Sequence, residues 1–517
     1  MTKKVKLSFW QIINMNVGFF GIQYSFGLQQ SAVNPIYDFL GASPDQLPIL
    51  NLAGPLTGLL IQPIIGALSD KTWLPKFGGR RKPFFFIGAI ICSLALFLFP
   101  FSSSLWMAAG LLWILDAGNN TAMEPYRAFI ADKLDESQQP TGFQAQSFFT
   151  GFGQTLANIS LFIFPMIFIG TTGKLPTWVF ASFFLGAVCS IGSVWWSSHT
   201  TKEIPPTDEE LEKIKSEKLN VFTPFIDIAS AIKDMPKVMW ILALVYLFQW
   251  YALFCYWQNS SKVVAKNSFE WRLLTDKESD AKKTYENFKV NLDKNQQYIS
   301  YNDLIEKNAK ANNLSLDSIN SINNNYESIY TKWKDKIATT NQLKDEDIKS
   351  LSFIYKNDKK YEKAVSWTGL VNGWYNVVTF LVAFSLVWMA RKYSAKSVHM
   401  LCLLIAGLGF IVFTFVENKY LFFPAITGFG IGWASMMGIP YLMVVSDIPK
   451  ERYGVYMGII NMMIVIPMFI QTITFGYIMK HFFNNDSNKA ILFAGVLLLI
   501  SATCTLFIKP KNKIISE

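Results

Sequence analysis

The chain has 517 residues, of which 51% are hydrophobic and only 16% are charged. This charged fraction is well below the roughly 25% of a soluble domain, and apolar runs of about 18 residues recur along the sequence. The composition excludes a soluble globular domain and indicates a polytopic membrane protein. The formal net charge of +10 does not point to nucleic acid, because Lys and Arg of membrane proteins gather in cytoplasmic loops.

Twelve membrane spans are predicted, and their short loops orient them. Basic residues follow the second, eighth, tenth and twelfth spans, and these loops fall on one side of the membrane. The positive-inside rule makes that side the cytoplasm, so both termini of this multi-pass protein of the inner (cytoplasmic) membrane are expected there. The predicted spans are residues 8–30, 46–68, 84–102, 105–130, 142–169, 177–197, 237–258, 365–390, 398–417, 420–446, 453–480 and 489–508.

A polar segment divides the spans six and six. We expect an N-terminal six-helix bundle over residues 1–197, a cytoplasmic linker over 198–236 and a C-terminal six-helix bundle over 237–259 and 363–517. Residues 260–362 are dense in Lys, Asn, Asp and Glu and form an extracytoplasmic insertion between helices seven and eight, expected to be a small helical module. The insertion is either a docking surface for an envelope partner or a solvated segment without a role in transport.

An internal repeat supports this division. The stretch from Glu124 to Asp132 resembles the stretch from Ile439 to Asp447, so the fourth span corresponds to the tenth. Parallel repeats of six spans build one large class of transporters. The second copy lacks the charges of the first, since Leu442 aligns with Arg127. This asymmetry places ion coupling in the N-terminal half.

The fourth span carries polar residues along one stripe. On a helix, Asp116, Asn120, Glu124 and Arg127 lie near one azimuth. Ionisable groups inside a membrane are costly unless they pair or face water. The stripe is therefore expected to face a polar cavity inside a helix bundle.

The loop after the second span has the layout of a gate. It reads Gly66-Ala-Leu-Ser-Asp70-Lys-Thr and continues to Gly-Arg80-Arg81, which resembles the loop motif of the major facilitator superfamily. Gly66 permits close helix approach, and Asp70 can pair with arginines or with a helix end across the cytoplasmic face. We expect a cytoplasmic gate at Gly66, Asp70, Arg80 and Arg81.

Four motifs in order narrow the resemblance. The segment Gly21-Ile-Gln-Tyr-Ser-Phe-Gly-Leu-Gln-Gln-Ser31, the segment from Gly54 to Gly66, the loop ending in Gly-Arg-Arg-Lys-Pro-Phe84 and the fourth span resemble the sucrose–proton symporters and their relatives in the glycoside–pentoside–hexuronide group. The resemblance implies an all-α membrane protein with the major facilitator fold, in which 12 helices form two six-helix bundles.

The same resemblance implies a function. It implies proton-coupled symport of a disaccharide or other α-glucoside, of the maltose or sucrose type, by alternating access. The span-four acid, Asp116, would accept the proton and Arg127 would be its paired guanidinium. Glu124 departs from the plant pattern and is either a second proton site or a fixed partner of Arg127.

The substrate site is expected to hold amides, carboxylates and aromatic faces, because a sugar offers hydroxyls and no charge. Single aromatic residues have packing as an alternative role, and amides have interhelical hydrogen bonding. The candidates near mid-span are Gln23, Tyr24, Gln29, Gln62, Asn119, Asn120, Gln154, Asn158, Gln249, Trp250, Trp257, Asn372, Trp374 and Asn376.

Other classes fit the sequence less well. Only three histidines are present, and we find no metal, phosphate-loop or nucleophile motif, so neither an enzyme nor a cofactor is expected. The five cysteines lie singly in apolar segments and predict no disulfides. The alternatives are a sodium-coupled or non-sugar transporter and a non-transporting sensor or scaffold. A monomer is expected.

Overall fold

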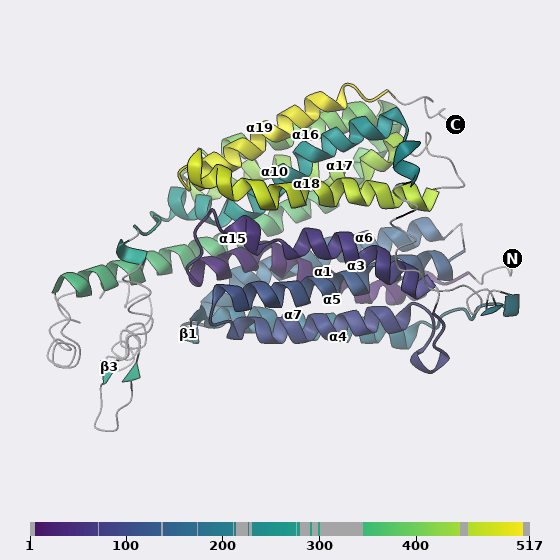
Figure 1. Cartoon of the computed structure of the whole chain (residues 1–517), viewed down its shortest axis with the longest axis horizontal. Helices are drawn as coiled ribbons and strands as arrows, with labels where there is room; N and C mark the ends of the chain where they lie inside the picture. The colour runs from purple at the N-terminus through teal and green to yellow at the C-terminus, as the bar shows by residue number, and fades with distance from the viewer. Residues whose placement is uncertain are drawn as a thin grey trace.

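The computed structural model describes residues 6–70, 72–135, 138–172, 174–209, 211–212, 226, 230–275, 277–279, 290–291, 298–299, 345–444 and 453–509. Twelve long helices dominate this part of the chain (Figure 1). They are α1 (Phe9–Phe39), α3 (Ala53–Asp70), α4 (Lys82–Leu98), α5 (Leu105–Lys133), α6 (Gln139–Ile167), α7 (Thr177–Thr200), α10 (Lys237–Ser268), α15 (Asp345–Lys392), α16 (Ala395–Phe413), α17 (Phe422–Val444), α18 (Tyr453–His481) and α19 (Ser487–Thr505).

Short elements connect the long helices. They are the helix α2 (Leu47–Leu50), the 3-10 turns η1 (Pro75–Phe77), η2 (Phe99–Phe101) and η3 (Lys419–Leu421), and two small antiparallel pairs, β1 (Thr171–Thr172) with β2 (Leu175–Pro176) and β3 (Val290–Asn291) with β4 (Tyr298–Ile299). The predicted all-α membrane architecture is confirmed.

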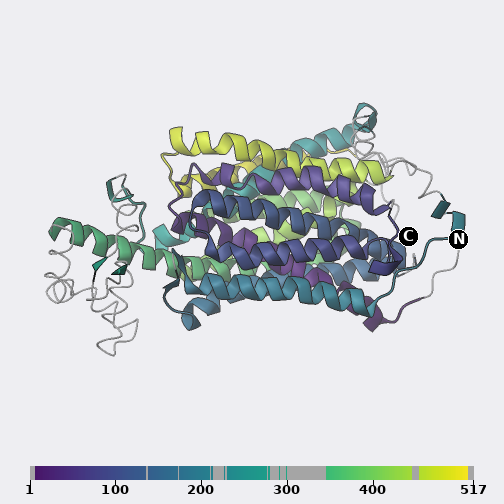
Figure 2. The same ribbon diagram turned by 60° about the horizontal axis from the view of Figure 1, so that its bottom comes forward.

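The helices form two bundles that lie against each other (Figure 1). The first contains α1 and α3 to α7, and the second contains α10 and α15 to α19. Both chain termini lie at one end of the molecule, while the free end of α15 projects from the other (Figure 2). We call these the termini end and the insertion end.

The two bundles repeat one helix arrangement. In the first, α1 packs on α6 and α7, α4 packs on α5 and α7, and α3 packs on α5. In the second, α10 packs on α18 and α19, α16 packs on α17 and α19, and α15 packs on α17. Pro125 lies inside α5 and Pro440 lies inside α17, at matching places in the two helices. The parallel repeat expected from the sequence is therefore present in the packing.

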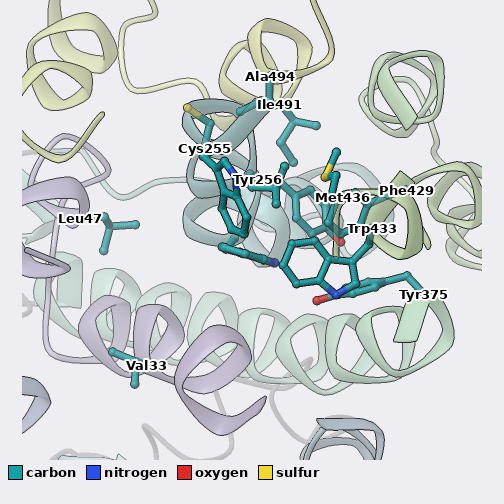
Figure 3. Packing of buried hydrophobic residues seen from close by; sticks show 14 of the residues in the cluster. Val33, Leu47, Cys255, Tyr256, Tyr375, Phe429, Trp433, Met436, Ile491 and Ala494 are labelled. Carbon is teal, nitrogen blue, oxygen red and sulfur yellow. The ribbon is translucent and has the colours of Figure 1, made fainter. Parts of the chain in front are cut away.

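Aromatic side chains fill the core of the second bundle (Figure 3). The ring of Tyr256 stacks on Phe410 with centroids 4.6 Å apart, and the ring of Phe429 meets Tyr375 at 4.8 Å. Trp433 packs beside Phe429 at 6.2 Å. In the first bundle, glycines bring α4 and α5 together, since a Cβ built on Gly88 would lie 2.6 Å from the carbonyl oxygen of Gly118. Both solutions give the dense packing that holds helices together in a membrane.

Within the described residues, nine helical segments are long and apolar enough to cross a membrane by composition alone. The long helices outside that set are α1, α5 and α15. Each of these three carries buried amide or carboxylate side chains, which lower its hydropathy. The least apolar helices are thus the ones that supply the candidate site.

The predicted ends of two spans were wrong. Helix α10 continues past the expected end at 258 to Ser268, and α15 begins at Asp345 rather than near 365. The segment before 365 contains neither Gly nor Pro, so nothing stops a polar helix from running out of the membrane. The predicted helical module lies for the most part outside the described residues, as does much of the linker.

Candidate functional site

Asp116 lies in the middle of α5 and is 1% exposed. Its Oδ1 accepts a hydrogen bond from Gln29 Nε2 of α1 at 2.7 Å. Its Oδ2 is buried without a hydrogen-bond partner, and a Cβ built on Gly54 of α3 would stop 3.8 Å short of it. One carboxylate oxygen is therefore anchored and the other remains available to a proton or a ligand.

An amide chain continues from Asp116 toward the second bundle. Asn120 Nδ2 donates to the backbone oxygen of Asp116 at 2.9 Å, and Gln62 Nε2 donates to Asn120 Oδ1 at 2.6 Å. Asn461 of α18 then donates to Gln62 Oε1 at 3.4 Å. These bonds connect the first bundle to the second at mid-membrane.

A second polar group joins α1 to α6. Gln154 Nε2 donates to Gln23 Oε1 at 2.9 Å, and Asn158 Nδ2 donates to the backbone oxygen of Gln154 at 2.8 Å. Tyr24 donates to Ser160 at 2.9 Å. The Oδ1 of Asn158 is buried and unbonded, so it can accept a donor from a ligand.

A third polar group belongs to the second bundle. Asn372 of α15 donates to Ser31 of α1 at 3.1 Å and accepts from Tyr256 at 2.8 Å, and Asn376 donates to the backbone oxygen of Asn372 at 3.0 Å. Both amide atoms of Gln249 are buried without a partner. Intramembrane polar atoms without partners are costly, so a bound polar molecule would relieve them.

The other aromatic and amide candidates are arranged differently. Trp250 Nε1 is buried and unbonded, and its ring lies 5.7 Å from that of Trp433 at 75°. Trp374 is 40% exposed and donates to Thr427, so it lies on the outside of the bundle and not with the candidate site. Asn119 donates to Ser25 at 3.0 Å inside the first bundle, which is a structural bond.

The expected pair of Asp116 and Arg127 is not formed. The two residues lie 11 positions apart on one continuous helix, which separates them by about 16 Å along its axis. Arg127 is exposed, Glu124 is partly buried, and within the described residues neither makes a hydrogen bond or ion pair. The azimuth of the stripe was predicted from the helical period, but its length spreads the groups over different depths.

Glu124 instead lies toward the termini end, beside Gly66. A Cβ on Gly66 would lie 3.7 Å from Glu124 Cγ. Near that end, Arg81 Nε donates to Asp132 Oδ2 at 2.8 Å, and Arg80 Nε donates to the backbone oxygen of Ser69 at 3.3 Å. These contacts hold the loop of the expected gate to its own bundle. The side chain of Asp70 lies outside the described residues.

The end of α7 also fastens this loop. The carboxylate of Glu203 accepts hydrogen bonds from the backbone N–H groups of Arg80, Arg81 and Lys82 at 2.7, 2.9 and 2.7 Å. These donors form the start of α4, where a negative charge is favourable. A carboxylate in this position was not predicted, because it follows the sixth span by sequence and reaches the second loop only in the fold.

Sequence reasoning also missed three residues at the insertion end. Asp38 of α1 is bonded by Lys262 of α10 and by Tyr361 of α15. Their positions at the ends of the predicted spans gave them the pattern of ordinary boundary residues. Among the described residues, no group of three or more His, Cys, Asp or Glu could hold a metal ion.

With this geometry described, comparison with known proteins identifies the family. A model of the Major Facilitator Superfamily matches residues 15–271. The described helices superpose on transporters of that fold, among them the nucleoside transporter NupG, with a TM-score of 0.62 at 11% identity over 97% of this chain and 99% of the other. The inward-open xylose transporter XylE from E. coli gives a TM-score of 0.56 at 12% identity over 98% of each chain. The chain belongs to the major facilitator superfamily and resembles its sucrose transporters.

The sequence relatives carry that second statement. The chain is 24% identical to sucrose transport protein SUT5 of Oryza sativa subsp. indica over 279 residues, which is 47% of this chain and 50% of that protein. It is 27% identical to sucrose transport protein SUC3 of Arabidopsis thaliana over 236 residues, 38% of this chain and 37% of that one. The chain thus spans about half the length, or less, of the curated relatives it matches.

Proposed function

We propose that the protein is a secondary active transporter that moves a disaccharide or other α-glucoside, of the maltose or sucrose type, together with a proton. The observation that carries this proposal is the carboxyl group of Asp116, which is buried at mid-membrane with Oδ2 unbonded. A carboxylate there is costly unless it is paired or protonated. Because its one bonded neighbour is a neutral amide, proton uptake is the simplest way to neutralise it.

The surrounding groups suit an uncharged polyol. Gln249, Asn158 and Gln29 each keep a buried amide atom without a partner. Amides can both donate to and accept from sugar hydroxyls, and no lysine or arginine is bonded into this central set. The names of the sucrose transport relatives agree with a sugar.

The coupling follows from alternating access between the two bundles. Asp116 takes a proton from the outer side, which removes the charge that opposes closure around the sugar. The bundles rock about the central amides, and the proton and sugar leave on the cytoplasmic side. Arg127 has no place in this cycle as a direct partner of Asp116, because a rigid α5 keeps the two apart.

The setting of the protein is part of the proposal. The basic short loops put both termini in the cytoplasm of a cell whose inner membrane holds the protein as a monomer. The insertion then lies on the outer face, where it can meet an envelope partner.

The test uses the full chain in lipid vesicles. Asp116→Asn is expected to abolish accumulation driven by a pH jump while leaving sugar counterflow, which needs no net proton movement. Glu417→Gln, an exposed carboxylate on a loop, is the matched control and should accumulate sugar normally. Wild-type accumulation by Asp116→Asn would refute the proton role. Accumulation that follows a sodium gradient would favour the sodium-coupled alternative, and absence of uptake across a sugar panel would favour a sensor or a non-sugar transporter.

A further inference from the structure

A buried ion pair joins the two bundles at the insertion end. Lys262 Nζ of α10 donates to Asp38 Oδ1 of α1, and the side chains are 2% and 8% exposed. The hydroxyl of Tyr361 on α15 donates to the other oxygen, Asp38 Oδ2. Both oxygens of an acid on the first bundle are therefore bonded by the second bundle.

Neighbouring contacts at this end also cross between the bundles. Asn34 Nδ2 of α1 donates to the backbone oxygen of Trp257 on α10 at 3.5 Å. The rings of Phe39 and Tyr361 meet at 5.6 Å and 67°. The ion pair is thus shielded from water by packing that exists only while the bundles touch.

The base of the insertion holds the two donors in position. Lys262 lies in the last turns of α10, and Tyr361 lies in the part of α15 that extends beyond the predicted span. Between them, Asn357 and the backbone of Arg272 exchange two hydrogen bonds at 3.2 and 2.8 Å, and the ring of Trp271 lies 5.0 Å from that of Tyr361. The donors therefore move as one unit with the second bundle.

The energetics make this cluster sensitive to the state of the bundles. A charge that loses its buried partner must find water or another partner, and a buried single charge is strongly unfavourable. Separation of the bundles at this end breaks both bonds to Asp38 and hydrates the groups. The cluster therefore contributes differently to the closed and open states, which is what shifts a two-state equilibrium.

We propose that Asp38, Lys262 and Tyr361 form the gate of the insertion end, bonded when that side is closed and broken when it opens. This inference rests on the proposed alternating access. The competing explanation is a static ion pair that stabilises the fold without favouring one state. The two differ in populations, and thermal stability alone does not separate them.

The experiment measures those populations without any sugar. Spin labels at Gln46 and Glu417, exposed residues of the first and second bundle, report the distance across the insertion end of the full chain in nanodiscs by double electron–electron resonance. Asp38→Asn and Lys262→Met are each expected to raise the open-to-closed ratio about tenfold or more. The charge exchange of Asp38→Lys with Lys262→Asp should restore part of the closed population.

A matched control lies one turn further along the same helix. Lys266 bonds Asp486 at 2.9 Å, within the second bundle, so Lys266→Met should leave the distances unchanged. Tyr361→Phe removes one hydroxyl and keeps the test valid if a charge variant does not fold. Wild-type distance distributions in folded Asp38→Asn, Lys262→Met or Tyr361→Phe would overturn the gate. Because no sugar is present, this result is independent of which substrate or ion the protein carries.

Discussion

Gly476 of α18 offers a way to shift the same equilibrium by sterics alone. It faces the backbone of Asp45, which lies in the first bundle just before α2, and a Cβ built on Gly476 would lie 2.4 Å from that carbonyl oxygen. Ordinary contact requires roughly 3.5 Å. In Gly476→Ala, the two bundles must therefore separate by about 1 Å at the insertion end or accept strain.

The magnitude follows from the cost of overpacking. Inserting a methyl group into a packed contact costs about 1–3 kcal/mol, and only the closed state bears this cost. The gain in helix propensity from Gly to Ala is the same in both states and cancels. The open-to-closed ratio should rise by a factor of about 5–150.

Thiol accessibility measures that ratio. Ser31 is 6% exposed and bonds Asn372 across the bundles, so Ser31→Cys is a small change that an impermeant thiosulfonate reaches only when the insertion end opens. The rate in the Gly476→Ala background should rise by the factor above, after subtraction of the parent chain with its native cysteines. Gly438→Ala is the control, because nothing lies within 4 Å of its added Cβ. Equal rates in the Gly476→Ala and Gly438→Ala backgrounds would refute the steric reasoning.

Three further outcomes are expected. Gly21→Ala places a Cβ 2.2 Å from a backbone oxygen of α7 and should lower the melting temperature in detergent, whereas Gly192→Ala, with open space, should not. The ion pair with Arg272 lowers the pKa of Glu278 to about 2. Its contribution to stability is complete above the ordinary value of about 4.3 and is lost as the pH falls toward 2, and Arg272→Gln should raise the midpoint, read by hydrogen exchange of residues 270–279. Gln249→Leu should weaken sugar binding about tenfold by calorimetry without loss of folding, since its amide has no internal partner.

Periodic and local properties were predictable from the sequence. Long apolar segments gave the helices, and the repeated Pro-Tyr motif gave the correspondence of α5 with α17, because both signals lie within one segment or two similar ones. The burial of Asp116 and Asn120 followed from the stripe they share.

Partner choice was not predictable, because it depends on how helices far apart in sequence are rotated. Asp116 bonds Gln29 across 87 positions, and nothing local distinguishes that amide from its neighbours. Asp38 and Lys262 lie 224 positions apart. Charges near span ends are common at membrane surfaces, so the pattern alone gave no reason to pair them.

Helix α1 connects the two proposed devices. Gln29 binds the proton-site carboxylate, Ser31 and Asn34 bond the second bundle, and Asp38 belongs to the gate cluster. Nine residues of helix separate Gln29 from Asp38, a distance of about 14 Å, and Pro35 interrupts the backbone bonding between them. A movement that breaks the bond of Asp38 to Lys262 must either carry Gln29 with it or bend α1 at Pro35. Since Gln29 holds one oxygen of Asp116, the first case makes the environment of the proton site depend on the state of the gate. A single helix thereby provides a physical link between proton binding and access, without Arg127 as an intermediary.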